Sequence, residues 1–171
     1  MTVPKPLAEV FAMFENPYNL ALITPPWLHF QVTSKQKVQM TVGAEIDYQF
    51  RWLGVPLSWK TRITAYDPPR CFVDEALRSP YVFWRHTHTF EAVPGGTLVR
   101  DVVDYKLPLG FKGRLAHAAA VRRNLTTIFT FRQRALNKHW GGEASIVWPT
   151  VRWLESRPSA PGTASPGYQG R

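Results

Sequence analysis

A regular alternation of apolar and polar residues is the feature that most constrains how this chain can fold. In AEIDYQFRW every second residue from Ile46 to Trp52 is aromatic or aliphatic, and PLSWKTRITAY follows a similar pattern from Leu57 to Ile63. Because successive side chains of a strand point to opposite faces, both segments are predicted to be strands with one buried and one solvated face. Further strands are predicted in LHFQVTS, CFVDEALR, YVFWRHTHTFEAV and TLVRDVVDYKL.

The connections between these strands are short and rich in turn-forming residues. They are LGVP, DPPR, Ser79-Pro80 and a turn around Pro94-Gly95-Gly96. Connections of this length join antiparallel strands into hairpins. The chain therefore predicts an antiparallel sheet built from consecutive hairpins.

Apolar residues at helical spacing precede and follow the strands. PLAEVFAMFEN and PYNLALIT predict two short N-terminal helices, and a long helix is predicted from Phe111 to His139, closed by Gly141-Gly142. The apolar stripe of the long helix consists of Leu115, Ala118, Val121, Leu125, Ile128, Phe129 and Leu136. This order of elements indicates an α+β fold in which a curved sheet grips the long helix, with a cavity between them.

The C-terminal part of the chain differs in composition from the rest. SRPSAPGTASPGYQGR is rich in Pro, Gly and Ser, a composition typical of disorder. We expect residues 1–140 to form one domain and residues 141–171 to be an extension that is partly disordered.

Several classes of protein are excluded by composition. The single cysteine, Cys71, excludes an internal disulfide framework and fits a reducing compartment. No apolar run approaches the roughly 18 residues of a membrane span, and MTVPKPLAEVF lacks the pattern of a signal peptide. We therefore expect a cytoplasmic protein.

Basic residues are concentrated in the predicted long helix. The net charge is +9, and no acidic residue occurs from Leu109 to Trp140. The basic residues there include Lys112, Arg114, Arg122, Arg123, Arg132, Arg134 and Lys138. They form either a solvated helix face or a contact surface for an anionic membrane or protein partner. No zinc-finger, RRM or KH motif is present, so nucleic acid is not expected as a partner.

The stretches EVFAMFENPYNLALITPPWLHF, residues 43–110 and GRLAH, within roughly Val3 to Asn137, resemble the START-like SRPBCC superfamily. This is the helix-grip fold of Bet v 1-type and polyketide-cyclase-type proteins, and the resemblance is strongest to its bacterial ligand-binding branch. The resemblance implies a pocket for an apolar or amphipathic small molecule. It implies no metal and no cofactor, and some relatives are aromatases, cyclases or hydrolases.

One feature departs from the superfamily pattern. Its members normally begin with a strand before the first helix, whereas only Met1-Thr2-Val3 precede Pro4 here. The first strand is therefore expected to be missing or truncated, which leaves TLVRDVVDYKL as an uncovered edge. A start further upstream is the favoured explanation; the SIVW segment or a second chain are the alternatives for covering that edge.

His86 and His88 stand in WRHTHTF, in the middle of a predicted strand. The even-numbered positions of this strand are the more apolar ones. Because side chains alternate, both histidines are predicted to face the helix, together with Trp84 and Phe90.

The hairpin turns predict which carboxylates lie near the histidines. A four-residue turn after YVFWRHTHTFEAV places Asp101 diagonal to His88, and diagonal neighbours lie about 7–8 Å apart. A two-residue turn at Ser79-Pro80 places Glu75 diagonal to His86. Since buried carboxylates need partners, histidine–carboxylate pairs are expected, although a one-residue slip would reverse a face.

The candidate ligand-binding residues combine this polar cluster with the inward-facing aromatic side chains. They are Tyr48, Trp59, Glu75, Trp84, His86, His88, Phe90, Asp101 and Tyr105. The favoured role of the cluster is a hydrogen-bonded pocket wall. A general base in an enzyme is the second interpretation. A metal site is the last, because no third histidine is in evidence.

Three functions follow, in order of preference. The first is binding of a hydrophobic or amphipathic small molecule such as a lipid, quinone or polyketide-like compound. The second is an enzyme of the cyclase/aromatase or dehydratase type. The third is a lipid chaperone at a membrane surface that uses the basic helix with Trp148 and Trp153. The oligomeric state is not predicted.

Overall fold

The computed structural model describes residues 1–52, 54–108, 121–141 and 150–154. Within them, one sheet has the strand order β1-β7-β6-β5-β4-β3-β2, and β8 pairs with β7. All pairs are antiparallel except β7–β8. The strands are β1 (Thr2–Val3), β2 (Gln31–Val32), β3 (Glu45–Trp52), β4 (Val55–Asp67), β5 (Cys71–Arg78), β6 (Phe83–Val93), β7 (Gly96–Lys106) and β8 (Thr150–Trp153).

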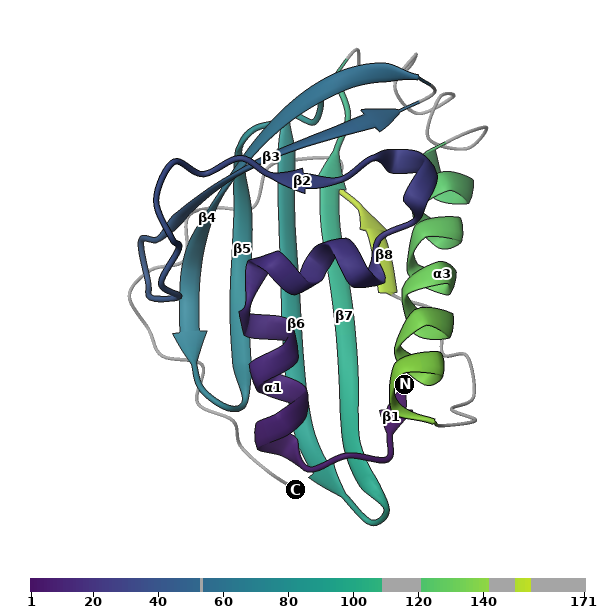
Figure 1. Cartoon of the computed structure of the whole chain (residues 1–171). Helices are drawn as coiled ribbons and strands as arrows, with labels where there is room; N and C mark the ends of the chain where they lie inside the picture. Colours follow the sequence, from purple (N-terminus) through teal and green to yellow (C-terminus); the bar gives the residue numbers. More distant parts are fainter. Residues whose placement is uncertain (53, 109–120, 142–149, 155–171) are drawn as a thin grey trace.

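The helices lie against the concave face of this sheet (Figure 1). They are α1 (Leu7–Glu15), the 3-10 helices η1 (Pro17–Ile23) and η2 (Pro26–Leu28), and α3 (Arg122–Trp140). The predicted α+β class and helix-grip fold are confirmed. Gly141 closes α3 in the left-handed conformation at φ 71°, as predicted, whereas residues 111–120 of the predicted helix fall outside the described residues. No helix in the described ranges is long and apolar enough to cross a membrane.

The first strand is truncated to two residues, as predicted, but the edge of the sheet at β7 is not uncovered, because β1 and β8 pair with different parts of it. β1 pairs with β7 through Thr2↔Leu98 and Val3↔Thr97. A glycine permits this approach, because a Cβ on Gly96 would stand 1.9 Å from the carbonyl oxygen of Val3. Two residues therefore suffice to protect this part of the edge.

The other half of the β7 edge is covered by β8, which runs parallel to it from Val102↔Thr150 to Tyr105↔Trp153. Arg152 forms a two-point ion pair with Asp104, with Nε–Oδ1 at 2.5 Å and Nη2–Oδ2 at 2.8 Å. Part of the predicted extension thus belongs to the sheet. SIVW and the segment predicted to be disordered lie outside the described residues.

The hairpin between β6 and β7 is tighter than predicted. Val93 pairs with Gly96 across a two-residue Pro94-Gly95 turn, and His88 lies directly opposite Asp101. The register differs by two residues from the predicted one. A shift of two preserves the faces of both strands, so the predicted inward face of β7 holds.

The hairpin between β5 and β6 differs by one residue, which has the opposite consequence. His86 pairs with Asp74, and Arg85 pairs with Glu75. Continued to the end of β5, this register sets Arg78 opposite Val82 and leaves three residues, 79–81, between them instead of the predicted two. Because an odd shift exchanges the faces of a strand, Asp74 faces inward and Glu75 faces outward.

Among the described residues, the apolar core consists of two clusters, one toward each end of the concave face. The first joins β1, α1 and the end of α3 to the sheet, with Phe11 packed edge-on against Phe72 and Phe90. The second packs Leu125 and Phe129 of α3 against β7. These clusters fix the distance between α3 and the sheet, which decides how much space remains between them.

Candidate functional site

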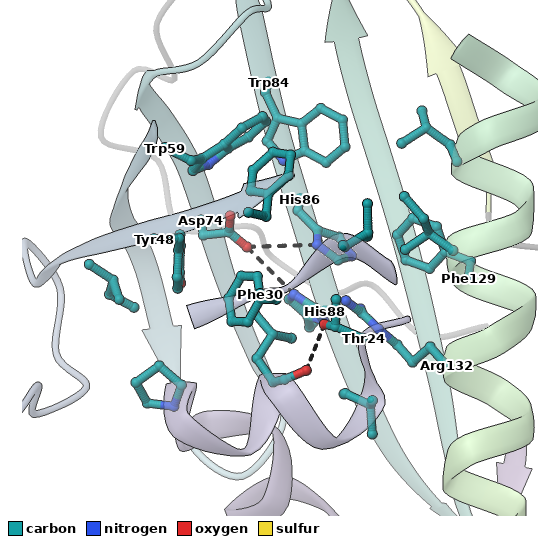
Figure 2. Close-up of a pocket in the computed structure, with 18 of the residues that line it drawn as sticks. Thr24, Phe30, Tyr48, Trp59, Asp74, Trp84, His86, His88, Phe129 and Arg132 are labelled. Atoms are coloured by element: carbon teal, nitrogen blue, oxygen red, sulfur yellow. Dashed lines mark hydrogen bonds and ion pairs between the residues drawn. The ribbon is translucent and has the colours of Figure 1, made fainter. Parts of the chain in front are cut away.

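A cavity of about 430 Å³ lies between the concave face of the sheet, the 3-10 helices and α3. Figure 2 shows that side chains from several strands and from α3 point into it. Most of its lining is apolar and aromatic. The lining includes Phe14, Trp27, Phe30, Met40, Tyr48, Phe50, Trp52, Trp59, Tyr81, Trp84, Leu125, Ile128 and Phe129.

Four ionisable side chains from three elements form one region of the cavity wall. Asp74 comes from β5, His86 and His88 from β6, and Arg132 from α3. The two histidines are 6% and 5% exposed and Arg132 is 8% exposed. We call Asp74, His86, His88 and Asp101 the buried cluster.

Each histidine of the buried cluster lies between two carboxylates. His86 Nε2 forms a hydrogen bond with Asp101 Oδ1 at 3.0 Å, and its Nδ1 is 3.8 Å from Asp74 Oδ2. His88 Nδ1 is 2.8 Å from the same Asp101 oxygen, and its Nε2 is 3.5 Å from Asp74 Oδ2. The contact of His88 Nδ1 is short but poorly aligned, so this nitrogen makes no regular hydrogen bond.

Neighbouring groups hold the buried cluster in place. The Thr61 hydroxyl is 3.0 Å from Asp74 Oδ1, to which it can donate, and Thr61 is completely buried. The His88 ring stacks on Phe72 at a centroid distance of 4.2 Å, and the two imidazoles are 3.8 Å apart. The cluster is therefore fixed by both polar and aromatic contacts.

The cluster strongly perturbs its own pKa values. Burial by itself would raise the pKa of Asp101, but its hydrogen bond with His86 and its close contact with His88 hold this pKa well below its usual range. Burial likewise opposes ionisation of Asp74, yet His88 and His86 keep its pKa low. Burial and the neighbouring His88 lower the pKa of His86. The pKa of His88 is raised, because the two aspartates outweigh the effect of burial.

Arg132 reaches the cluster from the opposite wall. Its Nη1 lies 3.9 Å from Asp101 Oδ1, and its guanidinium stands 4.9 Å from the centre of the Phe129 ring. Among the described residues, the Nε and Nη1 atoms have no hydrogen-bond partner. Burial lowers the pKa of Arg132, but an arginine keeps its charge in proteins. The cavity thus contains a buried cation whose Nε and Nη1 donors lack hydrogen-bond partners among the described residues.

The predicted site residues separate into three groups. Tyr48, Trp59, Trp84, His86 and His88 line the cavity. Asp101 lies behind the histidines, while Phe90 and Tyr105 are in the two core clusters. Their predicted role in ligand binding stays a prediction.

The predicted inward position of Glu75 is wrong. Its carboxylate pairs with Arg85 at 2.7 Å on the outer face. The sequence reasoning therefore chose the wrong one of two adjacent acidic residues, because the inward face of β5 depends on the parity of the turn that follows it.

Two site residues, Asp74 and Arg132, were missed. Arg132 was assigned to the basic surface of the long helix, but it occupies the apolar stripe between Phe129 and Leu136. The spacing of three and four residues was a usable signal. A charged residue on the buried stripe of a helix indicates a buried polar site.

Comparisons with known proteins agree with this fold. The sequence model of the family described as "Polyketide cyclase / dehydrase and lipid transport" matches residues 3–129. No curated protein is similar enough in sequence to count as a relative.

Several solved bacterial structures are similar in fold. A protein from Arthrobacter aurescens has a TM-score of 0.63 and 12% identity, covering 81% of this chain and 83% of that chain. One from Chromobacterium violaceum has a TM-score of 0.62 and 14% identity, covering 84% and 94%. One from Mycobacterium smegmatis has a TM-score of 0.59 and 17% identity, covering 81% and 88%. At these identities the likeness shows the fold alone.

Proposed function

Because this chain belongs to the polyketide cyclase/dehydrase and lipid transport family, we propose that it binds a hydrophobic or amphipathic small molecule between the sheet and α3. The family assignment confirms the SRPBCC resemblance that the sequence predicted. A lipid, a quinone and a polyketide-like compound are the classes of ligand that suit such a site.

The cavity is the observation that carries this proposal. Its volume of about 430 Å³ lies within the roughly 300–1,000 Å³ typical of small-molecule sites. Trp59, Tyr81 and Trp84 form one wall, with ring centroids 4.9 to 5.7 Å apart. Rings held this way form a preformed apolar surface, so little ordering is required when a ligand binds.

The polar wall supplies the orientation of the ligand. Among the described residues, Nε and Nη1 of Arg132 have no hydrogen-bond partner, and Tyr48 is a second donor whose pKa burial raises well above its usual value. An oxygen-bearing end of the ligand is expected here, and its apolar part is expected against the tryptophans. A buried donor without a partner costs about 1–3 kcal/mol, and a bound oxygen would remove that cost.

A fluorescent fatty acid, dansyl-undecanoic acid, tests the proposal. Saturable binding to the full chain is expected, and Ile128→Trp, which fills the cavity from α3, is expected to weaken it at least tenfold. The matched control is Arg134→Trp, the same change at an exposed position of the same helix, which leaves binding unchanged. Equal binding by both variants, or no saturable binding by the native chain, would count against the cavity as the site.

A second candidate is an enzyme of the cyclase/aromatase or dehydratase type. The observation that favours it is the His86–Asp101 hydrogen bond in the cavity wall, since a general base is commonly oriented by a carboxylate. However, the second ring nitrogen of His86 faces Asp74 rather than open space. Binding is therefore the better-supported function, and turnover abolished by His86→Ala would favour catalysis.

A role at an anionic membrane surface stays a prediction. Arg123, Arg134 and Lys138 are exposed on α3, but Arg132 points into the cavity. Lys112 and Arg114 lie outside the described residues. Salt-sensitive binding of the full chain to anionic vesicles would support this role.

A further inference from the structure

Three atoms of the buried cluster converge in the manner of metal ligands. Asp74 Oδ2 is 3.5 Å from His88 Nε2 and 3.8 Å from His86 Nδ1, and potential ligand atoms of these three residues lie within 4.8 Å of one another. Tetrahedral zinc with bonds of about 2.0–2.2 Å holds its ligand atoms roughly 3.3–3.6 Å apart. The observed spacing therefore needs only small side-chain adjustments.

When both histidines are neutral, the cluster favours a cation at this point. A neutral imidazole has one donor nitrogen and one acceptor nitrogen. If each ring directs its N–H toward Asp101, then His86 Nδ1 and His88 Nε2 present lone pairs to the Asp74 carboxylate. Two lone pairs facing a carboxylate oxygen repel it, and a positive ion between them turns this repulsion into attraction.

Asp101 and Thr61 contact the three potential ligands in the way that the outer shell of a metal site contacts its ligands. Histidine ligands usually donate their other N–H to a carboxylate, which orients the ring and raises its basicity. Asp101 Oδ1 forms a hydrogen bond of 3.0 Å with the other nitrogen of His86, and it is 2.8 Å from that of His88, where the contact is poorly aligned. Thr61 contacts Asp74 Oδ1 at 3.0 Å and leaves Oδ2 free to face the histidines.

Asp74 and Asp101 differ in their position relative to the cavity. Asp74, His86 and His88 line the cavity, while Asp101 does not. Figure 2 shows Asp74 in contact with both imidazoles from the neighbouring strand β5. An ion held by the three ligands would keep at least one coordination position directed toward the cavity, where water or an oxygen of a ligand could bind.

We propose that Asp74, His86 and His88 form a binding site for a divalent transition-metal ion, with zinc as the best match to two imidazoles and one carboxylate. Asp101 and Thr61 act as positioning residues. The sequence analysis ranked a metal site last because no third histidine is in evidence and because the family resemblance implies no metal. The proposal is independent of any hydrophobic ligand.

Cobalt(II) titration of the chelator-treated full chain tests the site directly, because tetrahedral cobalt absorbs strongly in the visible range. We expect a visible band that saturates at one ion per chain and is displaced by zinc. His86→Ala, His88→Ala and Asp74→Ala are each expected to weaken binding at least 100-fold. Asp101→Asn is expected to weaken it about 10- to 100-fold, as loss of an outer-shell carboxylate does.

Controls separate this site from other histidines and from misfolding. His29→Asn and His139→Gln change exposed histidines and are expected to leave the cobalt spectrum unchanged. If the alanine variants lose the native circular dichroism spectrum, the isosteric Asp74→Asn replaces Asp74→Ala in the cobalt titration. Failure of the native chain to bind cobalt or zinc at 1:1 would overturn the proposal, and so would binding that survives the His86→Ala/His88→Ala double change. Binding of dansyl-undecanoic acid tests the proposed function separately, so neither of these results would count against that function.

Discussion

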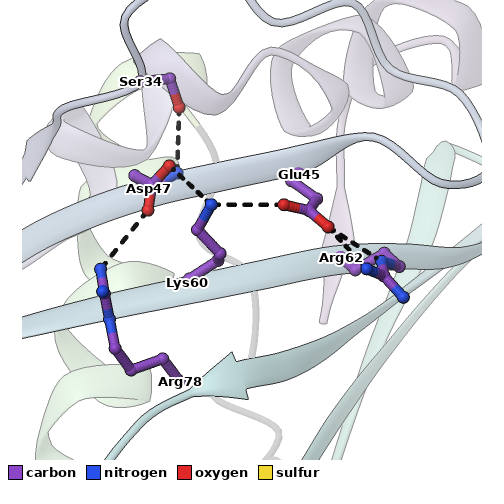
Figure 3. A network of polar contacts seen from close by, with 6 residues as sticks. All are labelled: Ser34, Glu45, Asp47, Lys60, Arg62 and Arg78. Atoms are coloured by element: carbon purple, nitrogen blue, oxygen red, sulfur yellow. Dashed lines mark hydrogen bonds and ion pairs between the residues drawn. The ribbon is translucent and has the colours of Figure 1, made fainter.

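Two ionic networks on opposite faces of the same sheet show how environment decides what charged residues do. On the outer face of β3 and β4, Glu45 pairs with Lys60 and Arg62, and Asp47 pairs with Lys60 and Arg78 (Figure 3). On the inner face, the buried cluster also sets carboxylates against basic groups across neighbouring strands. The two networks use the same pairing rule of opposite charges on adjacent strands.

Exposure to solvent separates the two networks. In the Arg62–Glu45 pair the side chains are 47% and 37% exposed, whereas the imidazoles of His86 and His88 are 8% and 7% exposed. Water and salt screen the outer pairs. The inner groups cannot exchange a lost partner for water, so each is strongly coupled to the others. The outer network is therefore a surface feature, whereas the inner network forms part of the candidate functional site.

The largest effect is expected for Asp101→Ala. This change leaves Arg132 without its nearest carboxylate and removes the shared partner of both histidines. Breaking a buried ion pair from one side costs about 3–5 kcal/mol, so the free energy of unfolding should fall by that amount. Urea denaturation followed by circular dichroism measures it, and a loss below about 1 kcal/mol would mean that the cluster is far more hydrated than its burial indicates.

A smaller effect is expected for Thr61→Val, which keeps the shape and removes the hydroxyl. Asp74 Oδ1 then loses the group 3.0 Å away that can donate to it. An unsatisfied buried acceptor costs about 1–3 kcal/mol. The same urea experiment measures it, with Thr64→Val at an exposed position of β4 as the control. Equal midpoints for the two variants would contradict a supporting role for Thr61.

Adjacent residues of β5 provide the sharpest contrast. Asp74→Asn changes the inward carboxylate, and Glu75→Gln changes the outward one that pairs with Arg85. A partly exposed pair contributes about 0–1 kcal/mol, so Glu75→Gln should cost no more than that and leave cobalt binding intact. If instead Glu75→Gln abolished cobalt binding and Asp74→Asn left it intact, the register of β5 against β6 would be the one predicted from the sequence and not the observed one.

The smallest effect is expected for Glu45→Gln in the outer network. Arg62 and Lys60 hold the pKa of Glu45 below its usual value, but this group is open to solvent and its interactions are screened. The urea midpoint should stay within the error of the measurement. Any difference from the native chain at low salt should disappear in 1 M NaCl, where the Debye length is about 3 Å. A salt-independent loss would show that the outer network is not a simple surface feature.

The sequence predicted faces correctly where the error in strand register was an even number of residues. The β6–β7 turn is two residues shorter than expected, yet Asp101 still faces the histidines because a shift of two preserves the face. The β5–β6 register is off by one, and that alone exchanged Glu75 for Asp74. The number of residues in a turn depends on the twist and packing of both strands. The residues of the turn alone therefore do not show whether that number is odd or even.

The sequence by itself determined the antiparallel sheet, the long helix and the inward position of the two histidines, because alternation and helical spacing are local properties. Tertiary structure decided which acidic residue joins the histidines and that Arg132 faces the cavity. It also decided that β1 and β8 cover the edge of β7. These outcomes depend on register and on contacts between segments distant in the chain, such as the passage of Val3 over Gly96.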